Sequence, residues 1–250
     1  MSLSLPSGSP PGGAPVAPSW RDCAADLLLG CVCAGCRAPG RRLCRACSTA
    51  CAPVPFAALP TPAPTELGRL PTLPVAAGAY EGVLRELIVG VKEHERFGLV
   101  KPLGTMLAAS VEAVLDAAGE AVVVLVPVPS SAAAVRRRGH DAVLRLARRA
   151  AAALRRDGRQ VSVAAVLAPT VGVLDQAGLS ALQRAGNLQG ALALRRGARV
   201  RELAVVVVDD VITTGASCAE AVRVLRGAGG RPVGVATVAA TPRRPRASAE

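Results

Sequence analysis

The sequence predicts an α/β protein in which a parallel β-sheet carries helices on both faces, with a small cysteine-rich module ahead of it. Strand-like and helix-like segments alternate from Val75 onward, as they do in βαβ units. The four valines at 205–208 form an apolar run that is typical of a strand buried on both faces. Seven of the eight cysteines lie between Cys23 and Cys51. A length of 250 residues suits one such domain with a small appendage.

Hydrophobic periodicity places the individual elements. Apolar residues at helical spacing predict helices near residues 83–91, 142–154 and 218–226. Apolar runs predict strands at residues 122–128, 161–167, 191–194, 205–208 and 233–238, all assigned to one sheet. Residues 169–190 read as one long loop. Ligands of parallel sheets bind at the carboxyl ends of the strands, so functional residues are expected there.

Shifts in composition divide the chain into segments. We expect disorder at 1–19, a cysteine module at 20–52, a proline-rich linker at 53–74, the α/β domain at 75–241 and a basic tail at 242–250. No basic residue precedes Arg21, and no apolar run approaches the ~18 residues that cross a bilayer. We therefore expect neither a secretory signal nor a membrane span, and a cytoplasmic location. Thiols stay reduced there unless they bind metal.

The charge balance favours anionic partners. The net charge is +12, and all but Lys92 and Lys101 of the 30 basic residues are arginines, whose guanidinium groups suit phosphates. A genome biased toward arginine codons would give part of the same composition. Aromatic residues make up only 2% of the chain, which is too few for a surface on which single-stranded bases stack.

An acid pair and a small-residue turn follow the valine strand. Asp209 and Asp210 are expected where the strand leaves the sheet, and a turn of Thr, Gly and Ser residues at 213–217 then leads into a helix. A helix entered through such a turn offers free N–H groups and hydroxyls to a phosphate. The carboxylates can accept hydrogen bonds from two adjacent hydroxyls, so the matching ligand is a ribose 5-phosphate. P-loop ATPases also carry a strand-end acid, but the required Gly-Lys dipeptide is absent from the chain.

The cysteines predict a structural zinc site. Cys33 and Cys36 form one Cys-x2-Cys pair, and Cys44 and Cys47 form another. Four thiolates from two such pairs close a tetrahedral Zn²⁺ site with no open position for catalysis. Cys31 or Cys51 can replace a neighbour, and unrelated reduced cysteines are the alternative. Metal removal should unfold this module and leave the α/β domain folded. Cys218 reads as a small buried hydrophobe.

Other polar residues fall near the same strand ends. Arg136, Arg137 and Arg138 are expected on a loop after strand 122–128, where they suit a pyrophosphate or simply begin the next helix. Within the 169–190 loop, Gln176 and Arg184 are candidate ligand contacts on an active-site lid.

Two single residues have open interpretations. Lys92, one of only two lysines, extends along its helix into solvent in one interpretation, and the family resemblance given below implies a substrate-facing role as the alternative. His140 is either a general acid or base or, as we favour, a structural residue.

The acid pair and its turn resemble the loop of type I phosphoribosyltransferases that binds 5-phosphoribosyl-1-pyrophosphate (PRPP). The resemblance assigns Asp209 and Asp210 to the ribose hydroxyls and implies a type I phosphoribosyltransferase-like sheet. It also implies Mg²⁺ bound with PRPP. It assigns the 5-phosphate to Thr213, Thr214, Gly215, Ala216 and Ser217.

Taken together, the motifs resemble the ComF family, phosphoribosyltransferase-like proteins associated with competence for DNA uptake. The shared features, in chain order, are the Cys-x2-Cys pair, Tyr80-Glu81-Gly82, Arg85-Glu86-Leu87-Ile88, Lys92, Pro127-Val128-Pro129, Arg138-Gly139, Gln176-Ala177-Gly178-Leu179, Arg184, Asn187-Leu188 and the Asp-Asp-x2-Thr-Thr-Gly loop. The resemblance implies an N-terminal zinc module, PRPP or ribose 5-phosphate as ligand, and a DNA-uptake context with single-stranded DNA and a helicase-type partner.

Two departures from the family pattern bear on catalysis. Asp141 stands where the family has Asn, which adds a negative charge beside the expected pyrophosphate site. Pro169 and Val171 stand where the lid has arginines, so transition-state stabilisation is reduced. Two functions therefore remain open: transfer of a phosphoribosyl group to an acceptor that the sequence does not identify, or non-catalytic binding of single-stranded DNA or a protein partner.

Overall fold

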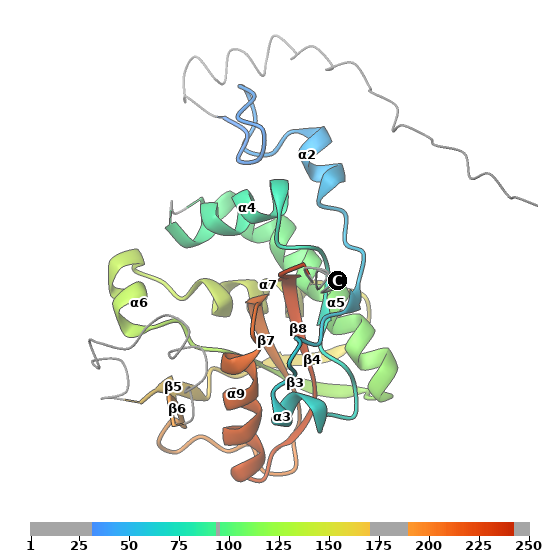
Figure 1. Ribbon diagram of the computed structural model, residues 1–250, viewed down its shortest axis with the longest axis vertical. Helices are drawn as coiled ribbons and strands as arrows, with labels where there is room; N and C mark the ends of the chain where they lie inside the picture. The colour runs from blue at the N-terminus through green and yellow to red at the C-terminus, as the bar shows by residue number, and fades with distance from the viewer. Residues whose placement is uncertain (1–31, 94–95, 171–189, 243–250) are drawn as a thin grey trace, which may run out of the picture.

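The computed structural model describes residues 32–93, 96–170 and 190–242. Their main feature is a six-stranded sheet in the order β1-β2-β8-β7-β3-β4 (Figure 1). Every neighbouring pair is parallel except β1 with β2, at one edge. The strands are β1 (Phe56–Ala57), β2 (Val75–Ala76), β3 (Val122–Pro127), β4 (Gln160–Val163), β7 (Ala204–Ile212) and β8 (Arg231–Ala240). The predicted α/β class with a mostly parallel sheet is confirmed.

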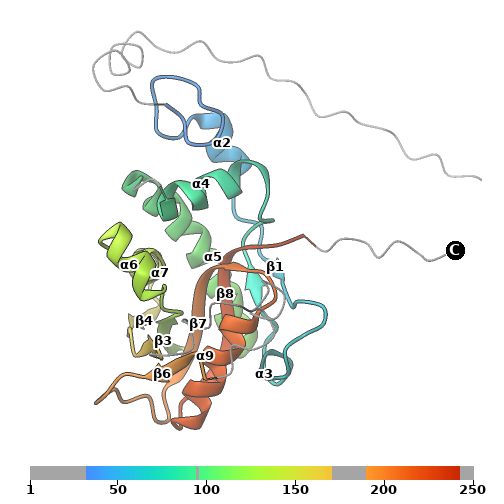
Figure 2. The ribbon, with the colours of Figure 1, turned by 60° about the vertical axis from the view of Figure 1, so that its left-hand side comes forward.

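Helices cover both faces of this sheet (Figure 2). Along β7, Val206 and Val208 point into one hydrophobic core while Val205 and Val207 point into the other, as the period of two in a strand requires. All four side chains are fully buried, which explains the unbroken valine run. The first face carries α4 (Gly82–Glu93), α5 (Val100–Ala118) and α7 (Ala142–Arg156), and the second carries α3 (Thr65–Gly68) and α9 (Ala216–Gly227).

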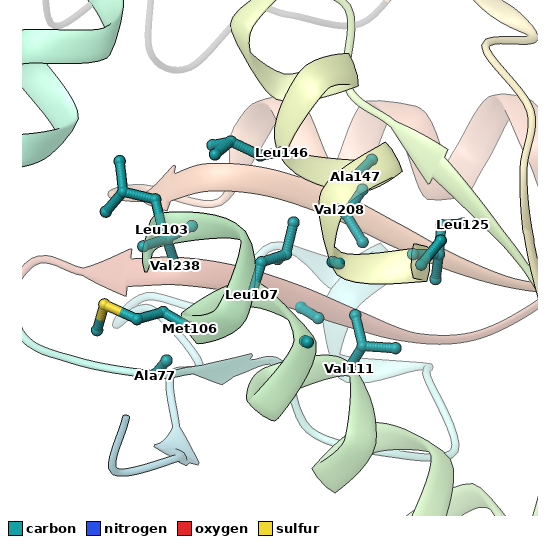
Figure 3. Packing of buried hydrophobic residues seen from close by; sticks show 14 of the residues in the cluster. Ala77, Leu103, Met106, Leu107, Val111, Leu125, Leu146, Ala147, Val208 and Val238 are labelled. Carbon is teal, nitrogen blue, oxygen red and sulfur yellow. The ribbon is translucent and has the colours of Figure 1, made fainter. Parts of the chain in front are cut away.

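The first core is the larger of the two. Leu103, Leu107 and Val111 of α5 face Val208 of β7 and Val238 of β8, and none of these side chains is exposed (Figure 3). Together with the short helix η1 (Phe97–Leu99), α5 forms a segment, Phe97–Ala118, that is long and apolar enough to cross a membrane by length and composition alone. Its buried side chains pack on the sheet instead, as expected of the central helix of a core.

The predicted strand at residues 161–167 is wrong as a single strand. β4 ends at Val163, and Leu167 begins β5 (Leu167–Pro169), which pairs antiparallel with β6 (Leu192–Leu194) in a separate two-stranded sheet. Residues 161 and 167 would share a face in an unbroken strand. Instead, Val161 lies in the first core and Leu167 in the second, so the chain must leave the sheet between them.

The proline-rich segment 53–74, expected as an extended linker, contacts the second core and β8. It contains β1 and α3, and Ala58 and Leu67 are buried in the second core. The Thr72 hydroxyl donates a 2.7 Å hydrogen bond to the carbonyl of Val233 in β8. These contacts make the segment part of the α/β domain.

The cysteine module packs on α4 (Figure 1). It contains α2 (Arg45–Ala50) and the preceding turns, and its Ala34 and Cys51 belong to the first core. Gly35 approaches α4 so closely that a Cβ atom there would lie 2.7 Å from Val83 Cγ1. The expectations for residues 1–19, the 171–189 part of the long loop and the tail from 243 lie outside the described residues.

Candidate functional site

The acid pair lies inside β7, not beyond its end. The strand continues to Ile212, and Asp209 pairs in register with Thr237 of β8. One carboxylate oxygen of Asp209 accepts a 2.8 Å hydrogen bond from the backbone N–H of Asp210. Asp210 is only 5% exposed. Two adjacent carboxylates are thus held at the carboxyl end of the central strand.

Lys92 joins this pair from a distant part of the sequence. Its Nζ atom lies 2.8 Å from Asp210 Oδ1, and it extends from the last turn of α4. Its side chain is 33% exposed, so it faces the site and is not extended into solvent. Burial lowers the pKa of Lys92, but the charge and hydrogen bond of Asp210, together with the charges of Asp209 and Tyr80, outweigh burial and raise this pKa above its ordinary value.

Burial sets the electrostatics of Asp209. Removal from water and the charge of Asp210 raise the pKa of Asp209 well above its ordinary value. The hydrogen bond from the Asp210 N–H and the ammonium of Lys92 lower this pKa, and the nearby carboxylate of Asp141 raises it further. Burial next to the same acids also raises the pKa of Cys218, so its thiol stays protonated as a small buried side chain.

The turn after β7 has the form expected of a phosphate site. Gly215 is the N-cap of α9 in the left-handed conformation, with φ of 75°, and it provides no side-chain cap for the helix. Thr213, Thr214 and Ser217 are exposed around it, whereas Gly215 itself is buried. The Thr214 hydroxyl accepts from the backbone N–H of Ala216 at 3.4 Å, and the exposed hydroxyls of Thr213 and Ser217 lie beside this helix N-terminus, next to the acid pair.

The three arginines lie on a helix, and the expectation of a loop is wrong. They form the last turn of α6 (Ala132–Arg138), where positive charge interacts favourably with the helix dipole. An Arg137 Nη2 donates to Glu93 at 2.7 Å, and the Arg138 Nε donates to the Ala134 carbonyl at 3.1 Å. Arg136 and Arg137 are exposed, so α6 offers guanidinium groups on the same side of the domain as α4.

Asp141 has a structural role that the sequence did not reveal. It is the N-cap of α7 and accepts from the backbone N–H of Leu144 at 3.2 Å. It also accepts from the N–H and the hydroxyl of Ser130, at 3.2 and 3.1 Å. These bonds tie the loop after β3 to α7. Its carboxylate is therefore held by protein donors as well as being close enough to act on Asp209.

His140 fits the structural interpretation. It is buried, its Nδ1 lies 2.7 Å from the Arg138 carbonyl, and its ring meets the Phe97 ring edge-on at 4.9 Å. Gln176 and Arg184, the two lid candidates, lie outside the described residues. Glu93 and Ser130 were not predicted as site residues, because their partners become neighbours only in the folded chain.

The second candidate site is the cysteine cluster. The sulfur atoms of Cys33, Cys36, Cys44 and Cys47 all lie within 4.8 Å of one another, as a single metal ion requires. Cys51 is buried outside this cluster, and Cys31 lies outside the described residues. The four predicted ligands are thus brought together, in a set that suits Zn²⁺.

The thiols differ in acidity. Burial raises the pKa of Cys33, but backbone N–H groups, that of Cys44 first among them, outweigh burial and lower it to about 6. Burial raises the pKa of Cys47, and hydrogen bonds with Cys44, Cys36 and Cys33 raise it further. A metal ion would displace the thiol protons on binding, so its affinity for this cluster depends on pH.

Comparisons with known proteins add a limited likeness. No protein-family model and no curated protein matches the chain. A hypoxanthine phosphoribosyltransferase from Staphylococcus aureus has 14% identity and a TM-score of 0.29, with 60% of this chain and 68% of that chain covered. The protein TT1426 from Thermus thermophilus has 18% identity and a TM-score of 0.30, with coverage of 59% and 86%. Values this low identify no activity.

Proposed function

We propose that the protein binds PRPP or ribose 5-phosphate at the carboxyl end of β7. The observation that supports this most is the N-terminus of α9, with exposed hydroxyls around it, directly after Asp209 and the buried Asp210. The turn provides donors for a phosphate, and the acids provide acceptors for a vicinal diol. The arginines of α6 would contact the pyrophosphate of PRPP, whose charge Mg²⁺ would partly neutralise. Gln176 and Arg184 are proposed to complete the site.

Binding is tested by calorimetry with ribose 5-phosphate, and with PRPP in the presence and absence of Mg²⁺. Each charge-assisted contact to a hydroxyl contributes roughly 1.5–3 kcal/mol, so Asp209→Ala with Asp210→Ala should abolish measurable binding. Asp157→Ala is the matched control, because Asp157 is exposed at the end of α7. Equal affinity of wild type and double variant would refute the proposal.

The associated reaction is transfer of the phosphoribosyl group. A nitrogen nucleophile would form a bond to C1 of the ribose while the bond from C1 to the pyrophosphate oxygen breaks, and pyrophosphate leaves with both bonding electrons. The pair Asp209–Asp210 would hold the ribose, and Arg136–Arg138 would stabilise the leaving group. This activity is measured as the release of pyrophosphate from PRPP in the presence of Mg²⁺ and a panel of amines. Release that does not exceed buffer hydrolysis would favour a binding role.

A second candidate function is binding of a nucleic-acid backbone. The exposed face of α7 carries Arg145, Arg148, Arg155 and Arg156, and no carboxylate of the described chain forms an ion pair with them. Counterion release would then drive binding of single-stranded DNA, which should weaken steeply with salt. If the arginines of α6 take part, saturating PRPP should compete with the DNA. Unchanged DNA affinity with PRPP would place the site on α7 or on the cysteine module.

The motif resemblance supports a place in the ComF family and in DNA uptake, with a helicase-type partner. Neither the fold nor the site geometry depends on that assignment. A pull-down of the helicase-type component of DNA uptake with the zinc-loaded chain would test it, with a chain lacking zinc as control.

A further inference from the structure

Lys92 and Asp210 form a largely buried ion pair next to Asp209. The ammonium meets Asp210 Oδ1 at 2.8 Å, and the carboxylate side chain is only 7% exposed. The two groups come from elements far apart in the sequence, the end of α4 and the end of β7. A pair in this position needs a reason, because a buried ion pair by itself contributes little to stability.

The surroundings of this pair are mostly acidic or neutral. Asp209 is the neighbour of Asp210 on β7, and the carboxylate of Asp141, at the start of α7, raises the pKa of Asp209. The thiol of Cys218 on α9 lies close enough to both acids for their charges to raise its pKa. Tyr80, in the segment before α4, contributes to the raised pKa of Lys92. Lys92 supplies the positive charge among these groups. Without it, two adjacent carboxylates with a third nearby would stand in a water-poor site, and one of them would take up a proton.

The hydrogen bonds leave part of each carboxylate open. Oδ1 of Asp210 forms the ion pair with Lys92, and Oδ1 of Asp209 accepts the hydrogen bond from the backbone N–H of Asp210. No other donor among the described residues bonds to either side chain. Each Oδ2 is thus an available acceptor, and the two hydroxyls of a ribose require two acceptors.

We infer that Lys92 is a positioning residue of the ribose site: its ammonium keeps the Asp209–Asp210 pair ionised and oriented, so that both carboxylates accept from the ligand's hydroxyls. This inference rests on the proposed function. Lys92 acts through the acids and does not itself contact the reacting atoms. Its removal should therefore weaken diol binding at neutral pH, and the loss should be reversed when a higher pH ionises the pair again.

The test compares Lys92→Gln and Lys92→Arg with the wild type, with Lys101→Gln as control. Lys101 is the other lysine and is exposed on α5. Ribose 5-phosphate affinity is measured by calorimetry from about pH 6 to about pH 8.5. The ligand's own phosphate titrates identically in every titration, so the ratio of two affinities at one pH reports the protein alone.

Lys92→Gln should bind about tenfold more weakly than the wild type near neutral pH, the loss of one charge-assisted contact, and should approach it at the highest pH. Lys92→Arg should stay within about threefold, because it retains the charge. An affinity ratio that does not change with pH, or an equal loss in Lys92→Arg, would overturn the inference.

A ligand-free measurement separates this inference from the proposed function. The carboxyl ¹³C resonance of Asp209 should titrate at higher pH in Lys92→Gln than in the wild type. An unchanged titration overturns the role of Lys92. If the wild type binds no ribose 5-phosphate but the carboxyl titration differs between Lys92→Gln and the wild type, the proposed function is refuted. The electrostatic role of Lys92 is then still supported.

Discussion

Gly215 of the phosphate turn lies directly against Leu67 of α3. A Cβ atom at Gly215 would lie 2.7 Å from Leu67 Cδ1 and 3.0 Å from Pro60 Cγ, and the backbone there has φ of +75°. The proline-rich segment therefore forms the back of the turn that is proposed to hold the 5-phosphate. Both the conformation and the close packing require glycine at this position.

Gly215→Ala should destabilise the protein and abolish ribose 5-phosphate binding. The left-handed conformation alone costs roughly 1–2 kcal/mol with a side chain, and the clash with Leu67 adds to it. Urea unfolding and calorimetry measure the two effects. Gly227→Ala is the matched control, because a Cβ atom there meets nothing within 4 Å. A Gly215→Ala chain with wild-type affinity would show that the turn does not contact the ligand.

Leu67→Ala should separate the two contributions to the destabilisation by Gly215→Ala, namely the clash with Leu67 and the cost of the left-handed conformation. Leu67 is 1% exposed, so truncation should reduce the free energy of unfolding by about 2–5 kcal/mol. In the Leu67→Ala, Gly215→Ala double variant the clash is gone but the left-handed φ remains. The double variant should thus lose less stability than the two single losses added together. Additive losses would mean that the methyl group and Leu67 do not meet.

The parts of this protein that were predictable from sequence are those with local causes. The valine run, the acid pair and the turn at 213–217 are contiguous, so β7 and α9 follow from neighbouring residues. The four clustered cysteines are likewise close in sequence. For β7 and α9, the pattern of hydrophobic residues was sufficient, because the face that each element buries is complete within one segment of the sequence.

The parts that were missed depend on contacts between distant segments. The prolines of 53–74 suggest an extended spacer, but Leu67 finds a place in the second core. Residues 161–167 form an apolar run that predicts one strand. The strand is interrupted because Val161 is buried in the first core and Leu167 in the second. The pairing of Lys92 with Asp210 has no local signal at all.

Asp209→Asn should stabilise the protein at neutral pH. The pKa of Asp209 is raised in the folded state above its ordinary value of 3.8, so ionisation of Asp209 costs more free energy in the folded state than in the unfolded chain. The resulting stabilisation is complete below the ordinary value and is lost as the pH rises through the folded-state pKa. Asn cannot ionise and avoids this loss. The gain should be roughly 0.5–2 kcal/mol, the usual size of a stabilising substitution.

Urea unfolding at about pH 7.5 and about pH 4 checks this prediction, because the difference between variant and wild type should shrink in acid. Asp157→Asn, at an exposed position, should show neither effect. The same Asp209→Asn chain should bind ribose 5-phosphate more weakly. A variant no more stable than the wild type at neutral pH would mean that burial of the Asp209 charge is not a cost to the fold.

Zinc should bind to the four clustered cysteines in about one equivalent. Cys33→Ser should lose the metal, whereas Cys51→Ala should keep it, because Cys51 is buried outside the cluster. Affinity should rise with pH, since the thiol of Cys47, whose pKa is raised, must lose its proton to bind. Metal analysis of reduced protein checks the stoichiometry. Less than about half an equivalent in the wild type would refute the site.

Removal of zinc should also weaken ribose 5-phosphate binding. The cysteine module packs on α4 through Gly35 and Val83 near the beginning of the helix, and the other end of α4 carries Lys92 to Asp210. Loss of the module's fold should let α4 shift and loosen that ion pair while the sheet remains folded. Chelation should therefore lower affinity in the wild type but have little further effect in Lys92→Gln, because the route through Lys92 is already lost. Calorimetry on both chains, with and without chelator, measures this. If the effects of chelation and of Lys92→Gln simply add, the module influences the site by another route.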